Sequence, residues 1–212
     1  MTIDTLLFDL DGTLVDSVRD LATALNLLRG ERDLPPLPLE RVRACVGDGA
    51  TLLVKRGLAE IPYEDELLKR FLCLYGEHLL DETTVYPGIR EFLDEQARRK
   101  LGIVTNKPAA FTRPLLDGLD LSRYFPVIVG GDSCAEKKPH PLPVRQALNK
   151  LGADAAGAVM IGDHHTDLRA GAAAVVRTCF CAWGLGHPDG TPYDDHAETP
   201  ADLPRLYPGA RP

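Results

Sequence analysis

Short apolar runs and amphipathic segments alternate along most of this chain. Runs typical of buried strands occupy residues 3–8, 101–104, 126–129, 158–161 and 175–181. From residue 89 onward, segments with hydrophobic residues at helical spacing lie between these runs. Strands that alternate with helices predict an α/β fold, a doubly wound parallel sheet of about five strands with helices on both faces.

Residues 16–85 interrupt this alternation. Helical spacing runs through residues 18–28, 39–46, 52–58 and 67–79, and Ser17 is a predicted N-cap of the first of these helices. We therefore expect a small all-helical unit at 16–85, inserted after the first strand of an α/β core formed by residues 1–15 and 86–212. Within that core, the residues from Trp183 onward are expected to form loop with a short helix near Leu203.

The composition argues against several classes of protein. The 212 residues are 44% hydrophobic, carry a net charge of −7 and give a pI of about 5.4. An acidic chain without a long basic run is a poor nucleic-acid or anionic-membrane binder. No apolar stretch approaches the roughly 20 residues of a spanning helix, and the first four residues lack the basic start of a signal peptide. We expect a cytoplasmic monomer or homodimer.

The cysteines support the same compartment. They are odd in number and lack the usual two-residue spacing of zinc and redox motifs. We interpret all five as reduced thiols: Cys45, Cys73, Cys134, Cys179 and Cys181.

Two carboxylates follow the first predicted strand. Asp9 and Asp11 are two residues apart, so in an extended segment their side chains point the same way. Two adjacent buried carboxylates need a proton or a cation, and a hard divalent ion such as Mg²⁺ is the simplest solution. The alternative is an Asp-Gly turn whose acids face water.

Three later strands also end in polar residues. Thr105 and Asn106 follow one strand, Lys138 lies beyond the next, and Gly162 and Asp163 follow a third, with Asp167 four residues on. Each has an ordinary alternative, such as a helix cap for Thr105 or Asp163 and a solvated loop for Lys138. Their order places them all where α/β sheets bind ligands, beyond the carboxyl ends of the strands.

These residues resemble the four motifs of the haloacid dehalogenase-like hydrolases, and within them the phosphoglycolate phosphatase branch. The run Asp9–Ser17 is similar to the first motif, Thr105 matches the second, and Gly162-Asp163-x-x-x-Asp167 matches the fourth. Lys138 matches the third motif better than Lys137 because it directly precedes a proline.

Two histidines depart from the family pattern. His164 stands where related phosphatases usually carry Ser or Thr, and His165 follows it. Two consequences of this pair stay open: altered hydrogen bonding around Asp163, or binding of a transition metal.

The resemblance and the charges together suggest a Mg²⁺-dependent phosphatase. In this hypothesis Asp9 attacks phosphorus and forms an aspartyl-phosphate, and Asp11 acts as general acid and then base. The ion is held by the Asp9 carboxylate, the backbone carbonyl of Asp11 and Asp163, and Asp167 orients the metal shell or Lys138. The phosphate oxygens are held by Lys138, Thr105, Gly12, Thr13 and Asn106.

The helical insertion matches what the family calls a cap, which selects substrates. Gly47, Asp48 and Gly49 are the predicted cap loop facing the site, and residues 46–50 resemble the loop of phosphoglycolate phosphatases. A helix break without ligand contact is the alternative. Three basic residues could meet a second anionic group or could be ordinary surface charges: Arg43, Lys55 and Arg56.

The expected substrate is a small phosphate ester, with 2-phosphoglycolate the best guess. A sugar phosphate, a nucleotide or pyrophosphate would suit the same chemistry, and so would a phosphomutase related to β-phosphoglucomutase. A non-catalytic phosphate-binding protein is the alternative from another class. Dehalogenation is disfavoured because it leaves Asp11 with no alcohol to protonate.

Overall fold

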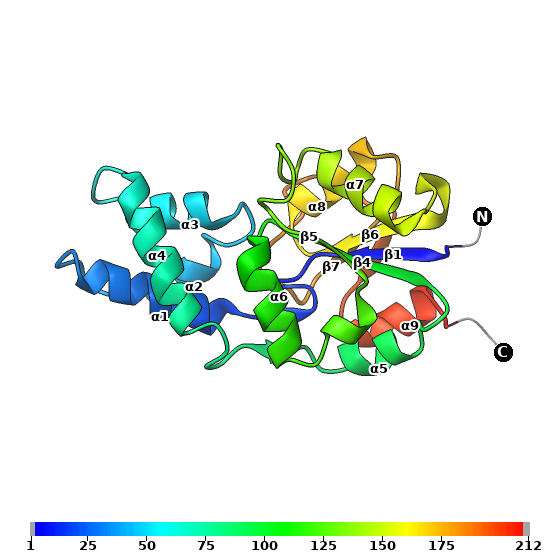
Figure 1. Ribbon diagram of the computed structural model, residues 1–212, viewed down its shortest axis with the longest axis horizontal. Coiled ribbons are helices and arrows are strands. Elements are labelled where there is room, and N and C mark those ends of the chain that lie inside the picture. The colour runs from blue at the N-terminus through cyan, green and yellow to red at the C-terminus, as the bar shows by residue number, and fades with distance from the viewer. Residues whose placement is uncertain (1–2, 210–212) are drawn as a thin grey trace.

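A six-stranded parallel sheet forms the centre of the computed structural model, which describes residues 3–209 (Figure 1). The ends of the predicted core, residues 1–2 and 210–212, lie outside the described residues. The strands follow the order β5-β4-β1-β6-β7-β8. Their bounds are β1 Thr5–Phe8, β4 Lys100–Val104, β5 Val127–Val129, β6 Ala158–Gly162, β7 Arg177–Cys181 and β8 Asp195–Ala197.

Strand β1 lies in the middle of the sheet and is buried along its whole length. Leu6 pairs with Leu101 of β4 on one side and with Val159 of β6 on the other. The chain winds outward through β4 and β5 and then reverses to β6, β7 and β8, so the winding direction changes beside β1. The predicted doubly wound fold is confirmed, and its ligand-binding edge lies at the carboxyl ends of β1, β4 and β6.

The sheet has one strand more than expected. Strand β8 lies in the tail that was predicted to be loop, and it pairs with the edge of β7 through Cys179 and Asp195. Asp195 also binds Arg177 and Tyr207 through its carboxylate. A three-residue edge strand held by polar contacts has no apolar run, so the hydrophobic pattern did not reveal it.

Helices cover both faces of the sheet. Along β1 the side chains alternate, so that Leu7 packs on one face while Leu6 and Phe8 pack on the other. The Leu7 face is covered by α7 (Leu142–Leu151) and α8 (His165–Ala173). The other face is covered by α5 (Ile89–Asp94), α6 (Ala109–Gly118) and α9 (Leu203–Leu206). Short 3₁₀ turns occupy Ser122–Tyr124, Ala155–Gly157 and Pro200–Asp202.

Four helices pack together at the opposite end of the molecule from the chain termini (Figure 1). They are α1 (Val18–Gly30), α2 (Leu39–Arg43), α3 (Ala50–Gly57) and α4 (Asp65–Glu77). A two-stranded antiparallel ribbon, β2 (Val15–Asp16) with β3 (Thr84–Val85), connects them to the sheet. The division of core from cap near residues 15 and 86 stays a prediction.

Ser17 does not cap α1 with its side chain as expected. Its hydroxyl donates instead to Asp11 Oδ1 at 2.5 Å, and the first-turn N–H of Val18 donates to Asp16 Oδ1 at 3.3 Å. An N-cap side chain accepts from a first-turn N–H, and the Ser17 hydroxyl makes no such bond.

Two expectations from composition concern bilayers and thiols. Among residues 3–209, no helix combines the length and apolar character needed to cross a bilayer. The cysteines are free thiols, as their spacing predicted: Cys45, Cys73, Cys134, Cys179 and Cys181.

Candidate active site

The structure brings the predicted polar residues of four separate loops to one edge of the sheet. Asp9 follows β1, Asp163 follows β6, and Asp167 lies in the first turn of α8. All three carboxylates are buried, and one oxygen from each lies within 4.8 Å of the others. Three of the four predicted acids therefore lie together, and the fourth, Asp11, is not in the cluster; their roles stay predictions.

Lys138 is the lysine that enters the cluster. Its side chain is 1% exposed, its Nζ lies 3.0 Å from Asp9 Oδ1, and it also donates to Asp167. The adjacent Lys137 instead donates to the backbone carbonyl of Asp48 at 2.7 Å. The structure therefore agrees with the choice of Lys138 over its neighbour, and it places Asp167 where it orients this lysine.

The cluster carries more negative than positive charge. Burial, and then the Asp167 carboxylate, raises the pKa of Asp9 to about 6 and that of Asp163 to about 7. Asp9 Oδ1 is buried and accepts no well-formed hydrogen bond. Three carboxylates with one ammonium leave an excess of two negative charges when ionised, and the donors are hard oxygens. The residues therefore fit a bound Mg²⁺ ion, held by Asp9 and Asp163.

Asp163 is held in place by hydrogen bonds to both of its oxygens. Thr13 Oγ1 donates to Asp163 Oδ1 at 2.8 Å, and Oδ2 accepts from the N–H groups of Leu185 and Gly186, each at 2.9 Å. Gly12 has φ +85°, and a Cβ there would lie 2.2 Å from Asp163 Oδ2. Gly12 and Thr13 thus pack around Asp163, and substrate contact by either residue stays a prediction.

Asp163 is not the N-cap of α8, which was its ordinary alternative. His164 is the N-cap, its N–H donates to Asp167 Oδ2 at 3.0 Å, and its ring Nδ1 accepts from the Thr166 N–H at 3.4 Å. Burial, and then the nearby His165, lowers the pKa of His164 to about 4, which keeps its ring neutral near pH 7.

Asp11 lies outside the three-carboxylate cluster and has its own partners. Lys107 Nζ donates to both Asp11 oxygens, at 3.0 and 3.1 Å, and Ser17 donates to one of them. Lys107 also donates to the hydroxyl of Tyr75 on α4. Burial lowers the pKa of Lys107, but Asp11 and Tyr75 more than offset this, so the net pKa is raised.

Sequence reasoning had not singled out Lys107 or Tyr75. Lys107 directly follows Asn106 at the end of β4, which was a usable signal. Tyr75 lies in the apolar stripe of a helix and carries no signal of its own.

The two predicted residues after β4 hold loops together. Thr105 Oγ1 accepts from the Lys107 N–H at 3.2 Å. The Asn106 side-chain amide donates to the carbonyls of Gly47 and Lys138, at 3.1 and 3.0 Å. Asn106 therefore ties the cap loop to the loop that carries the buried lysine, and its contact with substrate stays a prediction.

The predicted cap loop lies against the core. Gly47 has φ +114°, and a Cβ there would lie 2.5 Å from the ring of His164. Gly49 has φ +92°, and a Cβ there would lie 3.0 Å from Lys137 Nζ. These close approaches explain the two glycines, since other residues would be both strained and crowded there.

A cavity of about 50 Å³ lies between the cap and the strand ends. Lys107 is the one basic residue among the described residues that line it. The candidate cap cations lie elsewhere: Arg43 donates to the Gly184 carbonyl, Lys55 lies over the Tyr63 ring, and Arg56 pairs with Asp48 at 2.7 Å. The lining residues are Asp9, Asp11, Leu21, Val46, Gly47, Gly49, Ala50, Leu53, Phe71, Leu72, Tyr75, Thr105, Asn106, Lys107, Pro108 and Phe111.

Comparisons with known proteins agree with this geometry. The family model described as haloacid dehalogenase-like hydrolase matches residues 6–181. A protein named phosphoglycolate phosphatase from Chromobacterium violaceum is 40% identical, over 88% of this chain and 87% of its own length. A protein of the same name from Rhodospirillum rubrum is 42% identical, over 84% of this chain and 79% of its own length.

Solved structures show the same fold. The crystal structure of a predicted phosphoglycolate phosphatase from Haemophilus somnus superimposes with a TM-score of 0.88 at 27% identity, covering 97% of this chain and 98% of the other. A subfamily IA hydrolase of the haloacid dehalogenase superfamily from Geobacter sulfurreducens gives a TM-score of 0.79 at 22% identity, covering 97% and 100%.

Proposed function

The chain belongs to the haloacid dehalogenase-like hydrolases, and we propose that it is a Mg²⁺-dependent phosphatase whose substrate is 2-phosphoglycolate. In this proposal an aspartyl-phosphate forms on Asp9. The fold and the family support phosphatase chemistry. The small cavity between cap and core, with Lys107 as its basic residue, is the observation that favours this substrate.

Asp9 is the proposed nucleophile. One of its oxygens forms a bond to phosphorus while the bond from phosphorus to the leaving oxygen breaks. Lys138, 3.0 Å from Asp9 Oδ1, places a positive charge beside the reacting groups. Asp167 holds that lysine in position.

Asp11 is the proposed proton donor to the leaving oxygen. Lys107 Nζ lies 3.0 Å from Asp11 Oδ1 and orients the carboxyl group at the wall of the cavity. After the leaving group departs, the ionised Asp11 accepts a proton from the water that attacks the aspartyl-phosphate.

The proposed metal ligands are Asp9 and Asp163, with the backbone carbonyl of Asp11. When bound, Mg²⁺ offsets the repulsion between the attacking carboxylate and the phosphate. Thr13, Leu185 and Gly186 hold the Asp163 carboxylate in a fixed orientation for this role.

The cavity volume favours a very small leaving group. At roughly 10–15 Å³ for each water-sized sphere, 50 Å³ holds about four waters, comparable to the five heavy atoms of glycolate. A sugar or nucleoside would require the cap to move away. Lys107 is the basic residue of the lining, and its ammonium already donates to Asp11 and Tyr75, so in this proposal a substrate carboxylate shares the ammonium with these partners.

Phosphate release from a matched panel tests the proposal. With Mg²⁺, we expect 2-phosphoglycolate to be hydrolysed with a higher kcat/KM than glucose 6-phosphate or a nucleoside monophosphate, and a chelator should abolish release. Asp9→Asn keeps the shape of the nucleophile and should show no turnover.

Three results would contradict the proposal in different ways. If Asp9→Asn released phosphate at the wild-type rate, Asp9 would not be the nucleophile. Isomerisation of a hexose phosphate without phosphate release would indicate a phosphomutase. Phosphate binding without turnover of any ester would indicate a non-catalytic protein.

A further inference from the structure

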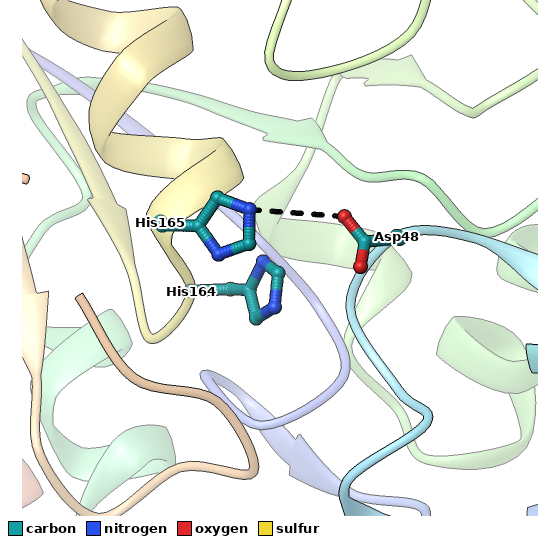
Figure 2. Close-up of side chains that lie close together, drawn as sticks. All are labelled: Asp48, His164 and His165. Atoms are coloured by element: carbon teal, nitrogen blue, oxygen red, sulfur yellow. Dashed lines mark ion pairs between the residues drawn. The ribbon is translucent and has the colours of Figure 1, made fainter. Parts of the chain in front are cut away.

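A second group of metal-binding side chains lies where the cap loop meets the core. Asp48 comes from the cap loop, and His164 and His165 come from the start of α8 (Figure 2). One ligand atom from each residue lies within 4.8 Å of the other two. We propose that these three residues bind a divalent transition-metal ion at a site distinct from the magnesium site.

The donor set distinguishes this cluster from the acidic one. Two imidazole nitrogens and one carboxylate oxygen are ligands typical of Zn²⁺ and Co²⁺, whereas Mg²⁺ prefers oxygens. Asp9, Asp163 and Asp167 supply only oxygens. The two sites would therefore select different ions.

The histidines have nitrogens available for an ion. Binding of an ion at His164 Nε2 uses the tautomer in which Nδ1 donates to Thr166 Oγ1, 3.0 Å away, in place of accepting from the Thr166 N–H. Nε2 lies close to Gly47 of the cap loop. His165 Nδ1 is buried without a hydrogen-bond partner, and Nε2 lies 3.8 Å from Asp48 Oδ1.

One oxygen of the Asp48 carboxylate is also available to bind an ion. Asp48 Oδ2 pairs with Arg56 at 2.7 Å, which orients the group and leaves Oδ1 facing the histidines (Figure 2). The ring centroids of His164 and His165 are 4.0 Å apart. Ligand atoms of a tetrahedral ion with bonds of about 2.1 Å lie about 3.4 Å apart, so the ligand separations, which are at most 4.8 Å here, shorten by up to about 1.4 Å when the ion binds.

The bound ion would tether the cap to the core. Asp48 belongs to the cap loop and the histidines to the start of α8, so one ion would cross-link these two segments. Cap opening admits substrate and releases product in enzymes of this kind of architecture. On the proposed function, transition-metal binding therefore lowers kcat even when Mg²⁺ saturates the catalytic site.

Cobalt binding to the full chain tests the site without depending on turnover. In saturating Mg²⁺, we expect one equivalent of Co²⁺ to produce visible absorption bands of nitrogen and oxygen ligation. His165→Gln should weaken this binding by about 100-fold or more, because loss of even an outer-shell partner costs 10–100-fold. Asp48→Asn, on the cap side, should weaken the same bands. His140→Gln is the matched control, since that ring accepts from the Leu142 N–H elsewhere on the core.

The outcomes separate the two proposals. Absence of the bands in the wild type, or their persistence in both His165→Gln and Asp48→Asn, would overturn the metal site. If the bands behave as expected, Zn²⁺ should lower kcat of the wild type in excess Mg²⁺ and should affect His165→Gln much less. A protein that binds Co²⁺ in this way yet hydrolyses no phosphate ester would contradict only the proposed function.

Discussion

The core and the cap present opposite kinds of side chain to the same cavity. The core side is charged, with Asp9, Asp11 and Lys107 reaching it from two strand ends. The cap side is largely apolar, and its lining residues include Leu21, Val46, Leu53, Phe71 and Leu72. The charged side suits phosphoryl transfer on any ester, whereas the apolar side limits the size of the leaving group. In the proposed function the apolar side therefore limits the size of the leaving group, while the core side supplies the reacting groups and the basic residue Lys107.

One of the polar connections between the two sides reaches the proposed proton donor. Tyr75 of α4 bonds to Lys107, and Lys107 pairs with Asp11. The proposed proton donor is therefore connected to a cap helix, so the position of the cap affects the core's chemistry. Substitutions on each side should separate these contributions.

The largest expected difference is in kcat, between variants at two adjacent lysines of the core. Lys138→Met removes the one ammonium in the three-carboxylate cluster, so kcat should fall by about 10³-fold, the scale of losing a preorganised electrostatic contact. Lys137→Met removes only the bond to the Asp48 carbonyl and should change kcat far less. Phosphate release in saturating substrate measures both. Equal losses in the two variants would contradict the assignment of Lys138.

Replacement of Lys107 tests the connection between the two sides. Lys107→Met should lower kcat/KM for 2-phosphoglycolate by about 100-fold, because charged hydrogen bonds contribute about 1.5–3 kcal/mol. The loss for an aryl phosphate should be smaller, since that substrate has no carboxylate to pair with the lysine. Lys150→Met, at an exposed position on α7, is the control. The same loss for both substrates would rule out recognition of the carboxylate by Lys107.

The sequence was most informative about residues whose position follows from a nearby strand or motif. Asp9, Asp163 and Lys138 could be predicted because each follows a strand whose hydrophobic run is clear, and parallel strands share one carboxyl edge. Their motif spacing then identified the family.

Residues whose roles depend on packing between distant elements were not predictable in the same way. Tyr75 looks like any aromatic residue in an apolar helix stripe until the fold brings it to Lys107, beyond the end of β4. Ser17 has the local pattern of a helix cap, but the turn after β1 brings its hydroxyl to Asp11. Strand β8 is only three residues long and includes Asp195 and His196, so it has no apolar run.

Metal removal should change stability through the core alone, and the effect should depend on pH. Burial raises the pKa values of Asp9 and Asp163 from 3.8 to about 6 and about 7. A carboxyl that holds its proton more tightly when folded loses stabilisation as pH rises, here between about pH 4 and pH 7 in the chelated protein. Mg²⁺ competes with these protons, so its stabilisation should grow over the same range. At about 100 times its Kd, the ion should add about 2.7 kcal/mol near pH 7.5 and less at pH 5.

Urea unfolding with Mg²⁺ and with chelator, compared at each pH, measures this difference. The paired comparison is needed because His164, whose pKa burial lowers to about 4, contributes the opposite slope. Asp163→Asn should remove most of the Mg²⁺ effect. Stabilisation that is constant from pH 5 to pH 7.5 would contradict the role of these carboxyls.

The smallest expected effect comes from the cap side of the polar chain. Tyr75→Phe removes the hydroxyl that accepts from Lys107 but keeps the ring, which stacks on Phe71 at a centroid distance of 5.9 Å. One hydrogen bond to a charged group, at about 1.5 kcal/mol, corresponds to a fall in kcat of about tenfold, with little change in the free energy of unfolding. Tyr63→Phe, which keeps the ring under Lys55, is the matched control. If the loss appeared in stability and not in kcat, Tyr75 would act only as a packing residue of the cap, and the chain to Asp11 would end at Lys107.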